Sequence, residues 1–208
     1  MKEIYTIGHS TYPIEYLLKR LLYHRIKCIA DVRSIPYSKH ASQYNMDELK
    51  KYLNSKGIFY LFMGKELGAR QLDKTLYTDK GYLDFNKFNK TELFKSGIER
   101  LKSGIDKDIK IALMCTEKDP INCHRNILVG REFHKQNYIV KNILADGNLE
   151  TQDSIEQRLL NMYFPNRQQT NLFDFMEGEQ NELDLINKAY NLRNQDIGYK
   201  IDQNEEEN

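Results

Sequence analysis

The chain has 208 residues, of which 40% are hydrophobic and 29% are charged. This length allows one well-buried core with an appendage rather than two full domains. No apolar run approaches the roughly 18 residues of a membrane span, so we expect an ordinary globular protein with no membrane partner. Only three cysteines are present, and the N-terminus enters strand-like sequence without the regions of a signal peptide, which predicts a cytoplasmic protein without disulfides.

The net charge of +1 hides an asymmetry along the chain. Residues 166–208 carry four Lys or Arg and ten Asp or Glu side chains, whereas residues 1–165 carry 27 basic and 20 acidic ones. A basic body is compatible with a polyanionic partner such as nucleic acid, and equally with a surface that only keeps the protein soluble.

Short apolar runs alternate with amphipathic stretches along most of the chain. Apolar and β-branched runs predict strands at residues 4–9, 26–34, 58–64, 109–115 and 138–144. Apolar residues at helical spacing predict helices at residues 13–25, 45–57, 91–104, 123–136 and 152–164. Because parallel strands need crossover connections, the alternation predicts a single three-layer α/β domain with a mostly parallel, Rossmann-like sheet.

Two segments interrupt this alternation. Residues 64–90 form a long insert with clustered aromatic residues, which is typical of a lid or binding loop, although a disordered excursion would look the same. From Asn166 onward the chain is rich in Asn, Gln and acidic residues. We therefore predict a domain at residues 1–165 and a flexible, largely disordered tail at 166–208, with one short helix around residues 182–193.

Polar residues follow each of the first four predicted strands. Ligands of open α/β sheets bind beyond the carboxyl ends of the strands, so we expect these residues to share one cleft. The candidates are His9 and Ser10, then Asp31, Arg33, Ser38 and Lys39, then Glu66, Gly68 and Arg70, and finally Cys115, Glu117, Cys123, His124 and Arg125. The helix predicted to begin at Cys123 would add the positive end of its dipole, which favours anions.

Four segments, YTIGHS, DVRSIPYSKHASQYN, YLFMGKELGAR and LMCTEKDPINCHR, together resemble the domain-of-unknown-function 488 family. The resemblance runs from about Ile4 to Leu144. Asn142 stands where members of that family often have His, and Gly68-Ala69 stands where many have two glycines. The resemblance implies an α/β fold with a shared polar cleft, and it names no reaction.

The cysteines allow two chemical interpretations. A zinc site of Cys115, Cys123 and His124 would have the spacing Cys-x₇-Cys-His, in which adjacent ligands rarely reach one ion, so we expect no metal. Alternatively, Cys123 near a helix N-terminus, beside His124 and Arg125, would have a lowered pKa and act as a nucleophile. Arg125 follows Cys123 too closely to form the phosphate loop of a phosphatase. At a strand end, Cys115 is also typical of a small buried apolar residue.

Glu117 and His9 are the candidates for acid–base catalysis. A carboxylate just past the central strand suits activation of water, although an ion pair with Arg33 or Arg125 would also explain it. His9 would position a substrate or donate a proton, or would be only a hydrogen-bonded turn residue. Neither GxGxxG nor GxxxxGK[ST] is present, and we expect no cofactor. The residues expected to hold a substrate anion are Ser10, Arg33, Lys39, Arg70, His124 and Arg125.

The acidic tail contains QTNLFDFM, which resembles the linear motif that docks proteins on DNA sliding clamps. Gln169, Leu172 and Phe173 match its bacterial form, and Phe175 contributes to the archaeal and eukaryotic form. A tail segment that packs back onto its own domain would carry the same apolar residues.

Together these features predict a hydrolase that acts on nucleic acid or nucleotides in DNA repair or replication. Cleavage of an N-glycosidic bond and of a phosphoester bond both fit, and the scarcity of carboxylates for a metal slightly favours the former. The alternatives are a non-enzymatic nucleic-acid or nucleotide binder and a small-molecule enzyme that uses the thiol of Cys115 or Cys123 as its catalytic group.

Overall fold

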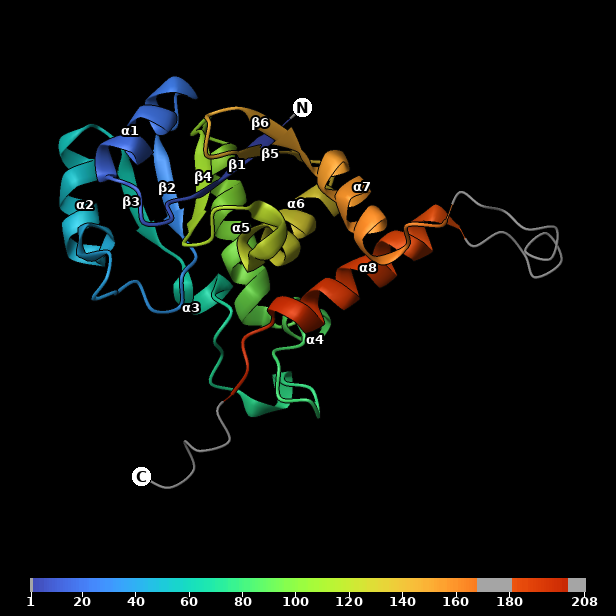
Figure 1. The fold of residues 1–208 in the computed structure, drawn as a ribbon. Helices are drawn as coiled ribbons and strands as arrows, with labels where there is room; N and C mark the ends of the chain where they lie inside the picture. Colours follow the sequence, from blue (N-terminus) through green and yellow to red (C-terminus); the bar gives the residue numbers. More distant parts are fainter. Residues whose placement is uncertain (1, 168–180, 202–208) are drawn as a thin grey trace, which may run out of the picture.

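A computed structural model describes residues 2–167 and 181–201, and in this part of the chain six strands form one sheet in the order β3-β2-β4-β1-β5-β6 (Figure 1). The strands are β1 (Glu3–Gly8), β2 (Cys28–Asp31), β3 (Phe59–Phe62), β4 (Ile111–Cys115), β5 (Ile139–Ile143) and β6 (Leu149–Thr151). The first five are parallel, and β6 pairs antiparallel with β5. The predicted α/β domain with a mostly parallel sheet is confirmed. β6 is absent from the prediction because three residues carry no periodic pattern.

Helices cover both faces of the sheet (Figure 1). One face packs against α1 (Ile14–Tyr23) and α2 (Met46–Ser55), and the other against α5 (Glu92–Ile105), α6 (Arg131–Lys135) and α7 (Gln152–Tyr163). Strand residues alternate between the two faces: Met114 lies in the core layer beside α1 and α2, whereas Cys115 lies in the opposite layer. The predicted three layers are therefore confirmed. Among the described helices, none combines the length and the apolar character needed to traverse a lipid bilayer.

The insert after β3 is part of the folded body. It contains the short helices α3 (Gly64–Leu67), η2 (Lys74–Leu76) and α4 (Phe85–Phe88). Its aromatic residues Phe85 and Phe88 are buried in the core. The side chain of Asn194 accepts a hydrogen bond from the Phe85 N–H and donates one to the Leu83 carbonyl, both at 2.9 Å. The clustered aromatic residues thus serve packing rather than an open lid.

The helix α8 (Glu182–Ile197) extends the folded body beyond the predicted end of the domain (Figure 1). Ala189 and Tyr190 of α8 are buried in the core. The Tyr190 hydroxyl accepts a hydrogen bond from Gln152 at 2.8 Å and donates one to Glu156 at 3.1 Å, both on α7. The folded body of the described residues thus includes α8, beyond the predicted boundary at residue 165, and α8 covers the helix predicted around residues 182–193. Much of α8 is held by polar contacts, so its sequence contains few apolar residues. For that reason its composition resembles that of a disordered tail.

Candidate functional site

A polar pocket of about 260 Å³ lies at the carboxyl ends of β2 and β4. Cys115 is the last residue of β4, Gly8 pairs with it at the end of β1, and Arg33 follows β2. Six of the predicted site residues line this pocket: Arg33, Arg70, Cys115, Glu117, Cys123 and His124. The parallel arrangement therefore gathers much of the predicted cleft, as expected for an open α/β sheet.

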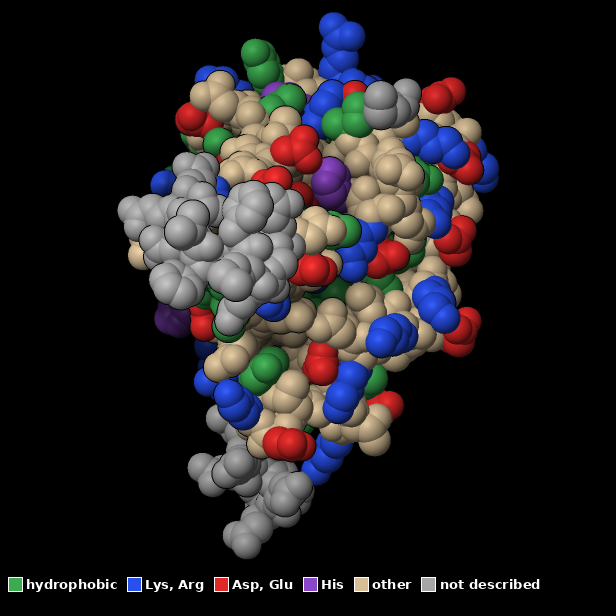
Figure 2. All heavy atoms as spheres, turned by 90° about the vertical axis from the view of Figure 1, so that its right-hand side faces the viewer, with side chains coloured by type: hydrophobic (Ala, Val, Ile, Leu, Met, Phe, Trp, Pro, Cys, Tyr) green, Lys and Arg blue, Asp and Glu red, His purple; other side chains and the backbone are tan. Residues whose placement is uncertain are grey.

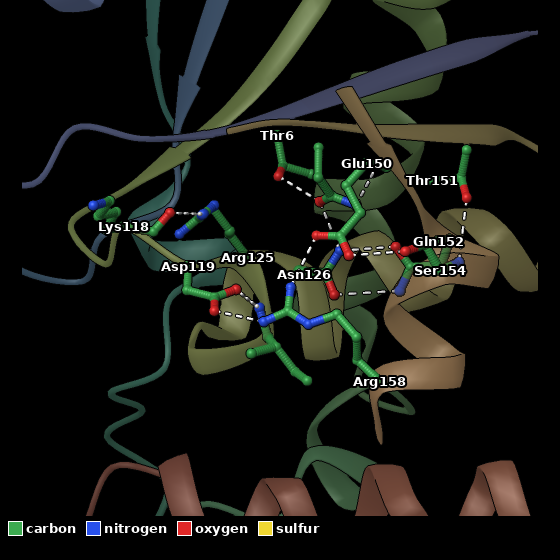
Figure 3. Close-up of polar contacts among 12 residues, drawn as sticks. Thr6, Lys118, Asp119, Arg125, Asn126, Glu150, Thr151, Gln152, Ser154 and Arg158 are labelled. Carbon is green, nitrogen blue, oxygen red and sulfur yellow. Dashed lines mark hydrogen bonds and ion pairs between the residues drawn. The ribbon is translucent and has the colours of Figure 1, made fainter. Parts of the chain in front are cut away.

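The loop after β4 folds back and returns Cys123 to the side of Cys115. Its turn is the short 3₁₀ helix η3 (Pro120–Asn122), whose N-terminus is capped by the Asp119 side chain, which accepts a hydrogen bond from the Ile121 N–H at 3.2 Å. Arg158 of α7 donates to Asp119 at 2.6 Å (Figure 3). Contacts far along the chain thus fix the path of this loop.

Arg125 supports the start of the same loop from inside the protein. It is fully buried and donates to the carbonyl groups of Glu117 at 2.7 Å and Lys118 at 3.4 Å, and Figure 3 shows it reaching toward the backbone at Lys118. β1 passes so close that a Cβ at Gly8 would lie 1.9 Å from the Glu117 carbonyl oxygen. The guanidinium of Arg125 therefore serves the protein backbone rather than lining the pocket for an anion.

Two thiols and one imidazole converge in the pocket lining. Nδ1 of His124 lies 3.8 Å from Sγ of Cys115 and 4.0 Å from Sγ of Cys123. These three atoms all lie within 4.8 Å of one another. Cys123 is extended, with φ −138° and ψ 136°, whereas His124 is already helical, with φ −58° and ψ −27°. This change of conformation turns the two adjacent side chains toward the same point, an arrangement that the sequence spacing predicts to be rare.

The other nitrogen of His124 fixes which side of the ring carries the proton. Nε2 lies 2.9 Å from the carbonyl oxygen of Val32, which can only accept a hydrogen bond. In the neutral ring, Nε2 therefore carries the proton and Nδ1 presents its lone pair to both sulfurs. His124 also begins the next helix, whose first segment is the π-helix η4 (Arg125–Gly130), a form often found at functional sites.

The carboxylate of Glu117 completes the group. The Cys123 thiol donates to Oε2 of Glu117 at 2.7 Å. Although the residue as a whole is exposed, burial of its carboxyl group and the nearby Cys123 raise the pKa of Glu117. No ion pair joins Glu117 to Arg33 or Arg125 in the described part of the chain, because Arg125 contacts only its backbone carbonyl. A carboxyl of this kind suits acid–base work.

The surroundings separate the acidities of the two thiols. Burial acts to raise the pKa of Cys123, but the hydrogen bond with Cys115 and the positive charge of Arg125 outweigh it and hold this pKa well below its usual value. The same hydrogen bond, together with burial, raises the pKa of Cys115. For His124, burial acts to lower the pKa, and the contact with Cys123 outweighs it and raises the pKa. Cys123 is thus the more readily deprotonated cysteine.

Arg33 and His9 form a buried network next to the pocket. Arg33 donates to both carboxylate oxygens of Asp31, at 2.9 and 2.5 Å, and to the Tyr44 carbonyl at 2.8 Å. Its third nitrogen lies 3.2 Å from Nε2 of His9, while Nδ1 of His9 lies 2.6 Å from the Ser10 carbonyl. Burial and the charge of Arg33 lower the pKa of His9 to about 4. At neutral pH, His9 is therefore an uncharged support for Arg33 and is not poised to donate a proton.

The remaining predicted anion-binding residues lie in different places. Arg70 is exposed at the pocket, with its guanidinium 4.3 Å from the ring centre of Tyr199. Lys39 is exposed and Ser10 is half-buried, and neither lines the pocket. The predicted partner-binding residues Gln169, Leu172, Phe173 and Phe175 lie outside the described residues.

The pocket also contains residues that the sequence did not indicate. Ser34 accepts a hydrogen bond from the Arg70 N–H at 2.8 Å, and Asn122 and Tyr199 line the wall. Tyr199 follows α8, in the segment expected to be disordered. The available signal was weak: apolar Ile197 and aromatic Tyr199 stand in an otherwise polar stretch and need a place to pack.

Comparison with known proteins gives a family match. A family model described as Domain of unknown function DUF488 matches residues 13–131, more than half of the chain. No curated protein and no solved structure matches the chain. The matched range includes β2, β3 and β4 and the cluster of Cys115, Cys123 and His124.

Proposed function

The chain belongs to the DUF488 family, whose description names no reaction, and from the pocket itself we propose that it is a hydrolase of nucleotides or nucleic acid. The observation that carries the proposal is the position of Glu117. Its carboxylate lies in a polar pocket beyond a central parallel strand, within 2.7 Å of the Cys123 thiol. A carboxylate so placed can take a proton from a water molecule and return it to a leaving group.

The pocket suits one nucleotide unit in size and charge. Its volume is about 260 Å³, and the exposed guanidinium of Arg70 is available to a phosphate group. Tyr199 lines the pocket beside it, and its ring supports the Arg70 guanidinium at 4.3 Å. As water attacks the sugar C1′ or the phosphorus, Glu117 would accept its proton, and the departing base or alcohol would take that proton back.

A substrate panel tests the proposal. Purified protein is incubated with nucleosides, nucleotides and short oligonucleotides, and release of free base or phosphate is followed by chromatography. Glu117→Gln should abolish turnover, whereas Glu99→Gln, an exposed residue of α5 paired with Lys102, should leave it unchanged. Turnover that survives Glu117→Gln would rule out the proposed role, and binding without any turnover would favour the non-enzymatic binder.

A cysteine enzyme is the second candidate, because Nδ1 of His124 presents its lone pair to both thiols. Such an imidazole can deprotonate a cysteine nucleophile. In that case Cys123→Ser would abolish activity on a reactive ester or carbonyl substrate, and Glu117→Gln would preserve most of it.

We propose the link to DNA repair or replication on the sequence pattern of Gln169, Leu172, Phe173 and Phe175. A peptide spanning Arg167 to Glu177 should bind the sliding clamp of the source organism with roughly micromolar affinity in calorimetry. Leu172→Ala combined with Phe173→Ala should remove the binding. Absence of heat with the unaltered peptide would remove the DNA link and leave the hydrolase proposal standing.

A further inference from the structure

We propose that Cys115, Cys123 and His124 bind a zinc ion, and that its fourth coordination position opens into the pocket beside Glu117. The inference deepens the proposed hydrolase, because a metal-bound water would then be the nucleophile. It rests on the convergence of two thiols and one imidazole, which stands independently of the identity of the substrate.

The distances fit a tetrahedral ion. Zn–S bonds of about 2.3 Å and Zn–N bonds of about 2.0 Å imply sulfur–nitrogen separations of roughly 3.5 Å. The observed separations from Nδ1 of His124 are 3.8 Å to Cys115 and 4.0 Å to Cys123. Small side-chain adjustments would therefore place one ion in contact with all three atoms.

The hydrogen bond on the far side of His124 matches that of a metal-binding histidine. Such histidines generally donate their other ring N–H to a carbonyl or carboxylate, which fixes the tautomer and the ring orientation. Here Nε2 lies 2.9 Å from the carbonyl oxygen of Val32, so Nδ1 is left as a lone-pair donor aimed at the thiols. The ring is thus oriented for coordination in advance.

The donor set and its surroundings favour zinc. Two thiolates and one imidazole are ligands that zinc prefers, and three protein ligands with an open position are typical of catalytic zinc. The two cysteines are 4% and 1% exposed, and the loop between them is held by Arg125 and Arg158. All three ligands line the same pocket as Glu117.

A second group of potential ligands does not share these properties. His134 lies 3.4 Å from Asp153 and 3.8 Å from Glu156 on the surface, where the Asp153 side chain is 83% exposed. An ordinary ion pair explains this group. The inference is therefore limited to the cysteine cluster.

A zinc ion at this site would supply a bound water molecule as the nucleophile, and Glu117 lies where it could take the proton of that water. Zinc lowers the pKa of bound water to about 7. Zinc-dependent nucleobase deaminases use the same combination of one His, two Cys and a Glu that is not a ligand. At this site Glu117 would take the proton of the metal-bound water, the hydroxide would attack the substrate, and the leaving group would depart with that proton.

The first measurement is metal content and coordination. Full-length protein purified without added metal should contain about one zinc per chain by elemental analysis, as expected for a single site. After exchange with cobalt(II), thiolate-to-cobalt absorption and tetrahedral d–d bands should appear. Cys115→Ser and Cys123→Ser should each lose these signals. Cys28→Ser, which alters a buried cysteine of β2 outside the cluster, should keep them.

Glu117→Gln and chelation separate this inference from the proposed function. The Glu117→Gln variant should keep the metal, because Glu117 is not one of the proposed ligands. Loss of the metal in this variant would mean that Glu117 occupies the fourth coordination position, which would contradict the proposed open site. If a cysteine variant fails to fold, chelation of the unaltered protein still tests the site. Metal binding without hydrolysis would leave the metal site standing and remove the hydrolase. Hydrolysis that survives chelation, with no cobalt spectrum, would remove the metal site and leave the hydrolase.

Discussion

At the scale of single residues, three arginines near the pocket share a charge and differ in what they contact. Arg33 and Arg125 are almost completely buried, and their donors point at Asp31 and at backbone carbonyls. Arg70 is exposed over the ring of Tyr199. Arg33 and Arg125 therefore shape the site from inside the protein, with Nε of Arg125 left without a hydrogen-bond partner among the described residues, and Arg70 is the arginine exposed at the pocket.

This difference predicts opposite outcomes for two matched variants. Arg125→Met removes a fully buried guanidinium together with its hydrogen bonds to the Glu117 and Lys118 carbonyl groups, and should lower the free energy of unfolding by about 3 kcal/mol. Arg70→Met alters an exposed side chain and should change that free energy by less than about 0.5 kcal/mol while weakening nucleotide binding. Urea denaturation and nucleotide titration measure the two effects. Equal stability losses would contradict the assignment.

The buried His9 predicts a pH dependence of stability. Its folded-state pKa of about 4 lies below the ordinary histidine pKa of 6.5, so the unfolded chain takes up the proton first as pH falls. The free energy of unfolding is therefore highest, as far as His9 is concerned, above about pH 6.5. It falls by roughly 3 kcal/mol as the pH is lowered toward 4. Denaturation at several pH values should show a smaller decline in His9→Asn than in the unaltered protein. The exposed His40→Asn is the control and should decline like the unaltered protein.

At the scale of elements, α8 connects the core to the site. Tyr190 contributes to the core between α7 and α8, and Arg193 donates to the Ile121 carbonyl in η3 at 2.9 Å. Tyr199, which follows the helix, then lines the pocket. One helix thus holds the turn that carries Cys123 and supplies part of the wall.

Removal of the Tyr190 ring should therefore destabilise the whole domain. Tyr190→Ala is expected to cost about 3–5 kcal/mol, as is usual for a large buried aromatic residue. Leu183→Ala, on the same helix with Leu183 59% exposed, should cost much less. Both are measured by chemical denaturation of the full chain. A Tyr190→Ala protein as stable as Leu183→Ala would mean that α8 is not part of the cooperative unit.

At the scale of the whole molecule, one face of the body can be compared with the basic balance of its sequence. On the face shown in Figure 2, Lys and Arg side chains alternate with Asp and Glu, and the side chains visible among the described residues form no continuous basic surface. If the proposed function holds, the face in Figure 2 offers no continuous track for a long nucleic-acid backbone, and we expect contacts with a few phosphates at the pocket.

Salt dependence measures this difference. Binding of a short single-stranded oligonucleotide through one or two phosphates should weaken with salt with a logarithmic slope of roughly −1 to −2, since each contact contributes about −0.7. Fluorescence anisotropy at several salt concentrations gives the slope. A slope steeper than about −4 would indicate an extended binding surface and would favour the non-enzymatic binder.

The sequence predicts the sheet, because the periodicities of strands and helices can be read from short segments. It also predicts that polar residues gather at one edge of the sheet, because the carboxyl ends of parallel strands lie at the same edge. It does not predict which polar residues face the pocket. Arg125 and Arg70 look equivalent in sequence, and only packing against Gly8 and the loop at Glu117 separates them. The approach of His124 to both thiols likewise depends on one change of backbone conformation, which spacing alone does not reveal.

The late position of Tyr199 in the chain affects the newly made protein. Ribosomes synthesise the five parallel strands by Ile143, and Tyr199 follows 56 residues later. At roughly 5–20 residues per second, about 3 to 11 seconds separate the two events. During that interval the nascent chain lacks Tyr199, so the wall of the pocket beside the cysteine cluster is complete only once translation has passed this residue.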